Sequence, residues 1–303
     1  MSAVESPAEA LTTLVPGGWW TVLRDLARTP TGAFGLVGSL LVVVVVLFAP
    51  VLAPHDPNAQ DIANRFAPPS AAHLLGTDAL GRDLASRVTY GTRAALVVAV
   101  PAVALGLVIG LLAGLAAGYL GRMVDISFIG LSDAALSFPP VVLALAVIGL
   151  FGPSRTIMVT VIGIAFAPYY FRVCRSLVLS ARGELYVEAE RSLGASAVRV
   201  VGLHILPWII PPLLIIAAMD IPSAIIFASG LSFIGIGTQP PDADLGVLLN
   251  EGYQHIFDSA WVLLAPAIAL AFVTLSFTFL SETVRDVTNP RAGAYRPRGR
   301  WRR

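Results

Sequence analysis

The segment Tyr186–Pro207, YVEAERSLGASAVRVVGLHILP, carries charges and a central glycine, and apolar sequence borders it on both sides. Leu185, Ala189 and Leu193 recur every fourth residue among good helix formers, which predicts a short helix with one apolar edge. Gly194 suits the left-handed backbone that ends many helices, so we expect a sharp corner there. A second short helix after the corner would complete a compact knob that docks into a cleft. The alternative interpretation is an amphipathic loop lying at the lipid headgroups.

The composition of the chain is that of a membrane protein. Of its 303 residues, 56% are hydrophobic and only 13% are charged, which is far from the balance of an ordinary soluble domain. Every basic residue is an arginine, since the sequence contains no lysine. The single cysteine, Cys174, can form no internal disulfide, and we expect it to be a buried thiol. Nothing in the composition points to nucleic acid as a partner.

Six apolar runs are long enough to cross about 30 Å of hydrocarbon, which takes roughly 20 residues of helix. We expect the third run to begin near Asp125 and to kink at Pro139-Pro140, and the fourth to continue as a helix beyond the membrane. The first run starts too late and is too long for a signal peptide, so it should stay as an anchor. The runs lie between Arg28 and His55, Arg93 and Arg122, Asp133 and Arg155, Arg155 and Arg172, Ile205 and Pro241, and Asp258 and Glu282.

The arginines lie mainly on one side of these runs, so the positive-inside rule places both termini and the 184–207 segment in the cytoplasm. The predicted organisation is a cytoplasmic tail at 1–32, the first membrane helix with an extracytoplasmic loop at 33–92, a core of five membrane helices at 93–286, and a basic cytoplasmic tail at 287–303. The predicted fold class is an all-α membrane protein with six transmembrane helices.

In the loop before the second run, an apolar stripe and two charge pairs share helical spacing. Leu80, Leu84 and Val88 recur every fourth residue, while Asp78 and Asp83 each precede an arginine by four positions. This spacing predicts a short helix at the outer membrane surface. A landing surface for a substrate-binding protein is its functional interpretation, and an ordinary interfacial helix is the alternative.

The sequence offers no catalytic or metal-binding constellation. A P-loop needs a lysine at the β and γ phosphates, so a chain without lysine has no such ATPase site. The histidines stand in different segments and match no zinc-binding spacing, so we expect the two on the outer loop to be solvated or structural. The four histidines are His55, His73, His204 and His255.

A glycine occupies every fourth position along the second run, which predicts a ridge where another helix backbone can approach closely. Packing within this chain is the first interpretation, and contact with a partner subunit is the alternative. The ridge consists of Gly106, Gly110, Gly114 and Gly118.

Four polar side chains inside the apolar runs are candidates for lining a polar path across the membrane. Asp220 is the only ionisable residue of the fifth run, and a charge at that depth costs about 2.5 to 3.5 kcal/mol, so it should face protein or water. Pro222 would bend the helix and open a polar pocket, whereas a hydrogen bond to a neighbouring helix is the structural alternative. Thr274, Thr278 and Ser281 share a face of the last run, although such hydroxyls more often bond to their own backbone.

The knob sequence resembles the EAA motif of ABC importer permeases. Two positions depart from the commonest form of the motif, because Glu190 replaces an alanine and His204 stands where isoleucine is usual. Four further blocks resemble the C-type permease of dipeptide, oligopeptide and nickel importers, so the resemblance extends through most of residues 30–291. The blocks are HLLGTDALGRDLASRVTYGTR (73–93), DAALSFPPVVLALA (133–146), GLSFIGIGTQPP (230–241) and ETVRDVTNPR (282–291), and the motif positions are Glu188, Ala189, Gly194, Ala195, Leu206 and Pro207.

This resemblance implies the type I ABC importer permease fold, in which the chain forms half of a translocation path with a second homologous permease subunit. It further implies two ATPase subunits that bind ATP and Mg, an extracytoplasmic substrate-binding protein, a peptide cargo and the cytoplasmic membrane of a bacterium. The chain itself would hold no cofactor. Glu188 would meet a basic residue of the ATPase, and Gly194 would make the turn that lets the knob enter it.

Two other classes of function stay open at this point. A self-sufficient secondary transporter or channel would need an internal inverted repeat and intramembrane ion ligands, but the sequence shows no convincing repeat and a single mid-span carboxylate. A membrane receptor or scaffold with the same fold would keep the knob without needing a polar path. The resemblance does not separate dipeptide, oligopeptide and nickel-chelate cargo, because the binding protein largely selects the cargo in this family.

Overall fold

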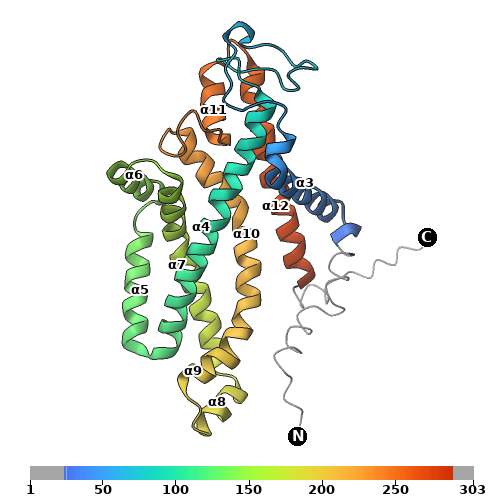
Figure 1. Ribbon diagram of the computed structural model, residues 1–303. Helices are drawn as coiled ribbons and strands as arrows, with labels where there is room; N and C mark the ends of the chain where they lie inside the picture. Colours follow the sequence, from blue (N-terminus) through green and yellow to red (C-terminus); the bar gives the residue numbers. More distant parts are fainter. Residues whose placement is uncertain (1–23, 25, 289–303) are drawn as a thin grey trace, which may run out of the picture.

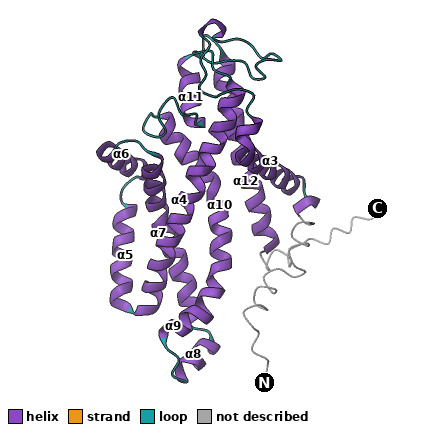
Figure 2. Cartoon of the chain, viewed as in Figure 1, coloured by secondary structure: helices purple, strands orange, loops and turns teal. Residues whose placement is uncertain are grey.

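The computed structural model, which describes Arg24 and residues 26–288, is a bundle of helices (Figures 1 and 2). No β-strand occurs among these residues, and the only strand-like contact within them is an isolated bridge between Thr77 and Asp83. The all-α prediction is therefore confirmed. The predicted terminal segments 1–32 and 287–303 lie mostly outside the described residues.

The helices begin and end where the sequence provides caps and breaks. The side chains of Thr29, Asp83 and Ser154 accept hydrogen bonds from backbone N–H groups in the first turns of α3, α4 and α7. Gly121, with φ 113°, separates α4 from α5. The helices are α3 (Pro30–Leu52), α4 (Leu84–Leu120), α5 (Arg122–Leu136), α6 (Pro140–Phe151), α7 (Arg155–Arg182), α8 (Leu185–Ser192), α9 (Ala197–Val200), α10 (Leu206–Phe233), α11 (Leu245–Gln254) and α12 (Ala260–Thr288).

Among the described residues, five of the six predicted membrane spans coincide with helical stretches long and apolar enough to cross a membrane, with shifted boundaries. The third predicted span corresponds to α5 with α6, which forms a sixth if this pair, bent by 84°, is one span. The bend lies at Ser137–Pro139, where the kink is predicted. The fourth span continues as one helix to Arg182, and α10 joins α9 through a π-helical turn at Val201–Ile205. The second span begins at Leu84, nine residues earlier than the sequence suggests.

Helices α4 and α7 form the most extensive contact of the bundle. The four glycines at every fourth position of α4 are all buried and lie against α7. A Cβ atom added at any of them would collide with atoms of α7, including those of Tyr170, Cys174 and Val178. The ridge therefore packs inside this chain, as the first interpretation has it, and it lets the two backbones approach closely.

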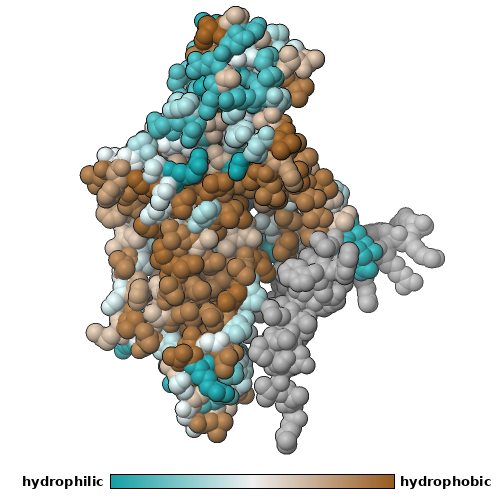
Figure 3. All heavy atoms as spheres, in the orientation of Figure 1, coloured by the Kyte–Doolittle hydropathy of each residue, from teal (hydrophilic) through white to brown (hydrophobic). Residues whose placement is uncertain are grey.

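Two polar regions project from opposite ends of the bundle. We call residues 53–83 and 234–259 the cap, which includes α11, and residues 184–207 the knob, which includes α8 and α9 (Figure 1). Figure 3 shows a broad apolar band between the hydrophilic cap and the hydrophilic patch at the opposite end. This band is what a membrane requires of a spanning surface.

The prediction of a separate short helix at the outer surface, around Leu80 and Val88, is wrong. Residues 79–82 are not helical, and α4 starts directly at Leu84 and runs on through the apolar stretch. Asp83 caps α4 instead of pairing with Arg87, so the regular spacing of charges does not reflect one helical face. The short helix α11 was not predicted, although Asp244 before Leu245 is a good capping residue.

Candidate functional site

The knob is two short helices joined at a glycine corner. Gly194 adopts φ 85°, and its N–H donates to the carbonyl of Arg191 at 3.0 Å. The N–H of Ala195 donates to the carbonyl of Glu190 at 3.1 Å, which completes a Schellman turn at the end of α8. Ser196 then caps α9 through the N–H of Arg199. The predicted corner at Gly194 is therefore present.

The knob is anchored to the bundle by its own buried side chains. Val187 of α8 and Val200 of α9 are fully buried. They pack in one apolar cluster with residues of α7, of α10 and of the turn before α10. The cluster consists of Cys174, Val178, Ala181, Val187, Val200, Ile205, Ile209 and Leu213. A force applied to the knob therefore acts on α7 and α10 together.

The outer face of the knob exposes large apolar side chains. Leu185, Leu193 and Val198 are 82%, 85% and 84% exposed. The apolar edge predicted for the first helix therefore faces away from the chain instead of packing on it. The motif residues Glu188, Ala189 and Gly194 are exposed beside this edge, while Ala195, Leu206 and Pro207 are half-buried.

The two positions that depart from the commonest motif face each other. The Nε2 atom of His204 lies 3.8 Å from Oε1 of Glu190, and the two side chains are 25% and 33% exposed. The ring of Tyr186 lies 6.0 Å from the imidazole. An acid and a histidine therefore occupy neighbouring positions between α8 and the turn that leads into α10.

In the bundle, Asp220 of α10 is half-buried and bonds to a neighbouring helix. The hydroxyl of Tyr170 on α7 donates to Oδ2 of Asp220 at 2.7 Å. This is the contact that the structural alternative for Asp220 requires. The bond ties together the two helices that carry the knob.

The predicted hydroxyl face of α12 is divided between two kinds of contact. Thr274 donates to the carbonyl of Leu270 in its own helix at 2.8 Å. Ser281 is buried and donates across to the carbonyl of Ala218 on α10 at 3.2 Å. Thr278 is half-buried on the same helix. The hydroxyls of Thr274 and Ser281 therefore have backbone carbonyl acceptors, which is the structural interpretation of such residues.

The cap encloses a buried charge network that sequence reasoning missed. Oδ2 of Asp78 accepts from Nη1 of Arg87 at 2.6 Å and from Nε of Arg82 at 2.7 Å. Both arginines also donate to Oε2 of Glu251 on α11. Arg87 is fully buried and Arg82 is 4% exposed. Only the Asp78–Arg82 pair could be read from spacing, because Glu251 is more than 160 residues away in the chain.

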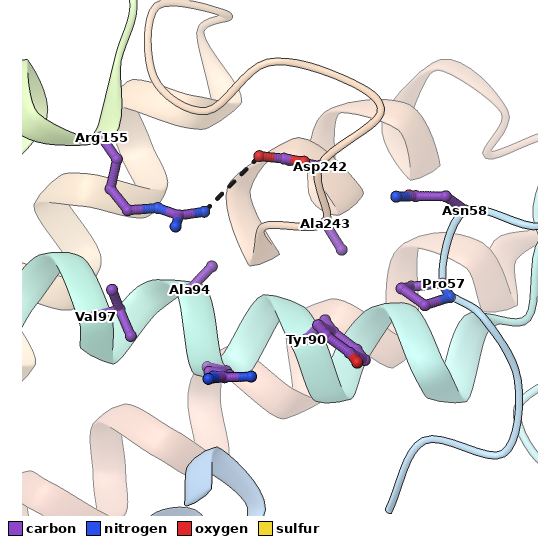
Figure 4. Close-up of a pocket in the computed structure, with 9 residues that line it drawn as sticks. Pro57, Asn58, Tyr90, Ala94, Val97, Arg155, Asp242 and Ala243 are labelled. Atoms are coloured by element: carbon purple, nitrogen blue, oxygen red, sulfur yellow. Dashed lines mark ion pairs between the residues drawn. The ribbon is translucent and has the colours of Figure 1, made fainter. Parts of the chain in front are cut away.

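A pocket of about 410 Å³ opens beside the cap. Tyr90, Ala94 and Val97 line one side of it from α4, and Asp242 and Ala243 approach from the loop before α11 (Figure 4). Arg155 at the start of α7 points across the pocket to Asp242, with Nη2 3.8 Å from Oδ2. Pro57, Asn58 and Arg93 complete the lining, which therefore holds two arginines and one aspartate.

Comparison with known sequences places most of the chain in one family. Residues 106–293 match the family described as binding-protein-dependent transport system inner membrane component. Residues 18–69 match the N-terminal TM domain of oligopeptide transport permease C. The two matches cover α3 and the chain from Gly106 of α4 through α12, and residues 70–105 lie between them.

Full-length relatives have similar lengths and related names. The chain is 37% identical to a probable D,D-dipeptide transport system permease protein of Escherichia coli, over 88% of this chain and 90% of the relative. It is 32% identical to a dipeptide transport system permease protein of Alkalihalophilus pseudofirmus, over 94% and 93%. It is 34% identical to a nickel transport system permease protein of Escherichia coli, over 84% and 92%.

Proposed function

The chain belongs to the family of binding-protein-dependent transport system inner membrane components, and from this premise we propose that it is the peptide-conducting permease subunit of an ABC importer, coupled to its ATPases through the knob. In this proposal the cap faces the extracytoplasmic side and both termini lie in the cytoplasm. A second homologous permease completes the path, and two ATPase subunits supply the energy of ATP hydrolysis.

The observation that carries the coupling proposal is the exposed apolar face of an anchored knob. Large apolar side chains exposed on a polar segment outside the apolar band are candidates for burial against a partner. Leu185, Leu193 and Val198 project from a segment whose inner side, at Val187 and Val200, is fixed to the bundle. A partner that seats on the outer face can therefore move α7 and α10 without first distorting the knob.

ATP chemistry belongs to partner subunits in this proposal. The chain has no lysine and hence no P-loop, so ATP and Mg would be held by the ATPase subunits. Glu188 is exposed next to the apolar face, where its carboxylate can meet a basic side chain of such a partner.

A peptide cargo is supported by the names of relatives and by the charges of the pocket beside the cap. Two of the relatives named above are dipeptide permeases. Arg93, Arg155 and Asp242 offer partners for both ends of an unprotected peptide, a carboxylate and an ammonium group. We propose that cargo leaving the binding protein first meets the chain here.

Site-directed cross-linking tests the coupling proposal. Cys174 is fully buried, so Leu193→Cys introduces an accessible thiol on the knob, and a thiol-reactive photocross-linker attached there should capture the ATPase subunit in the assembled complex. Phe257→Cys, on a fully exposed position of the cap, is the matched control and should never capture it. ATPase cross-links from Phe257→Cys, or none from Leu193→Cys in an active complex, would refute the assignment of the knob.

A further inference from the structure

The cap brings together two histidines and an aspartate from three separate segments. Nδ1 of His73 lies 2.9 Å from Oδ1 of Asp83, and Nδ1 of His55 lies 3.8 Å from the same oxygen. The two imidazole rings are 5.0 Å apart. The sequence predicts the two histidines as unrelated, because 18 positions separate them and no known spacing joins them.

Asp83 is held so that one carboxylate oxygen faces the imidazoles. Its Oδ2 accepts from the N–H of Ser86 at 2.8 Å and from the hydroxyl of Ser86 at 2.7 Å, while the side chain is only 1% exposed. Ser86 therefore orients the carboxylate, with Oδ1 left facing the two histidines.

We propose that His55, His73 and Asp83 form a binding site for a divalent transition-metal ion such as Zn²⁺. Imidazole nitrogen and carboxylate oxygen are the ligands that Zn²⁺ takes at about 2.0 to 2.2 Å. The 2.9 Å between His73 and Asp83 is within about 0.5 Å of the roughly 3.4 Å that separates two ligands of a tetrahedral ion with bonds of about 2.1 Å. All three ligand atoms lie within 4.8 Å of one another, so the widest pair must close by up to about 1.4 Å.

The imidazole that must move is that of His55, and its exposure to solvent leaves room for this movement. The side chain of His55 is 43% exposed and follows the end of α3, whereas that of His73 is 21% exposed. Solvent can therefore supply the remaining ligands, as in sites with an open coordination position. The backbone N–H of His55 already donates to the hydroxyl of Ser86 at 3.0 Å, which keeps the loop close to Asp83. The ion would fasten the loop after α3 to the first turn of α4.

Metal binding to the purified full-length chain tests this site without any transport assay. The chain is prepared in detergent with an affinity tag that lacks histidine, stripped with EDTA, and dialysed against Zn²⁺ or Co²⁺. We expect about one ion per chain, a raised melting temperature, and a visible Co²⁺ spectrum of a nitrogen- and oxygen-ligated ion. His73→Gln should weaken binding about tenfold or more, which is at least the effect seen when groups around metal ligands are changed.

Two variants separate a metal site from a set of hydrogen bonds. His55→Gln alters a half-exposed side chain, so the chain should fold normally and still lose affinity by about tenfold. His255→Gln is the matched control, because His255 forms a similar exposed pair with Asp258 at 3.0 Å elsewhere in the cap. Binding that is absent in the unmodified chain, or equal in all variants, overturns the proposal and leaves a hydrogen-bonded cluster only. This result would not affect the proposed transport function.

Discussion

The cap and the knob treat polar and apolar side chains in opposite ways. The cap buries charge, since Asp78 and Arg82, together with Arg87 at the start of α4, are at most 4% exposed and form ion pairs with one another and with Glu251. The knob exposes large apolar groups such as Leu193, although buried valines lie directly beneath it. Both regions leave the apolar band, but the cap closes on itself, whereas the knob is a surface that a partner would complete.

This difference means that the side chains of the cap contribute to the free energy of folding, whereas the outer side chains of the knob contribute to the free energy of binding a partner. A buried ion pair is stable only while all of its members remain, because removing one leaves an uncompensated charge in a dry environment. An exposed leucine gains nothing until another surface removes it from water, where it contributes about 1.5 to 3 kcal/mol. Substitutions in the cap should therefore change folding, and substitutions on the outer knob should change association.

Gly194→Asp should give the largest functional effect. The corner is exposed, and nothing lies within 4 Å of a Cβ atom added there, so the chain itself has room for the side chain. Aspartate also tolerates the left-handed backbone better than most residues, at about 1 to 2 kcal/mol. We expect normal insertion and abolished uptake, measured with reconstituted complex, because a charge now stands at the docking face. Gly194→Asn, similar in size but neutral, should retain part of the uptake. Full uptake by the aspartate variant would contradict the interpretation of the knob as a surface that a partner completes.

Arg87→Met should have the largest effect on stability. Arg87 is fully buried and holds both Asp78 and Glu251 at 2.6 Å, so its loss leaves Arg82 to balance both carboxylates. Breaking such a buried pair costs about 3 to 5 kcal/mol, which should appear as a lower melting temperature and a lower yield of folded chain. Arg155→Met is the control, because its pair with Asp242 is 3.8 Å long and exposed. Equal melting temperatures for the two variants would show that the cap does not depend on buried charge.

Leu193→Ser tests whether the outer side of the knob contributes to association with the ATPase and not to folding. Losing one buried leucine at an interface removes about 1.5 to 3 kcal/mol, so the affinity for the ATPase should fall roughly tenfold to hundredfold. The melting temperature of the isolated chain should not fall, since Leu193 is 85% exposed. Val187→Ser, two turns away but fully buried, should lower the melting temperature instead. A drop in stability for Leu193→Ser with no change in ATPase binding contradicts the assignment.

Sequence reasoning succeeded where short-range pattern determines structure. The knob is predicted by an apolar residue at every fourth position and one glycine. The spans are predicted by hydropathy, which does not depend on how distant segments pack. It failed in the cap, where the spacing of Asp83 and Arg87 suggests a pair but Asp83 caps a helix and Arg87 turns to Asp78. Glu251 and His55 could not be assigned either, because their partners are set by how distant segments pack.

Tyr170→Phe and Asp220→Asn probe the link between the two helices that carry the knob. The bond from the Tyr170 hydroxyl to Asp220 spans 2.7 Å, and a hydrogen bond of this kind contributes about 1 kcal/mol. Asp220→Asn keeps an acceptor, so its melting temperature should change less than that of Tyr170→Phe, which leaves the carboxylate without this donor. If Asp220→Asn keeps stability but lowers uptake, Asp220 serves the translocation path and not only the packing of α7 on α10.

The pair of Glu190 and His204 should give the smallest effect, and a double-mutant cycle is needed to see it. The atoms are 3.8 Å apart and the side chains are partly exposed, so the coupling should be about 0.2 to 1 kcal/mol. Glu190→Ala and His204→Ile restore the commoner residues of the motif one at a time and together. Because the two side chains are only 25% and 33% exposed, the cycle should show coupling in the melting temperature and little in ATPase affinity. Coupling in ATPase affinity alone would mean that the partner contacts this pair directly, which would extend the docking face beyond the exposed leucines to the turn before α10.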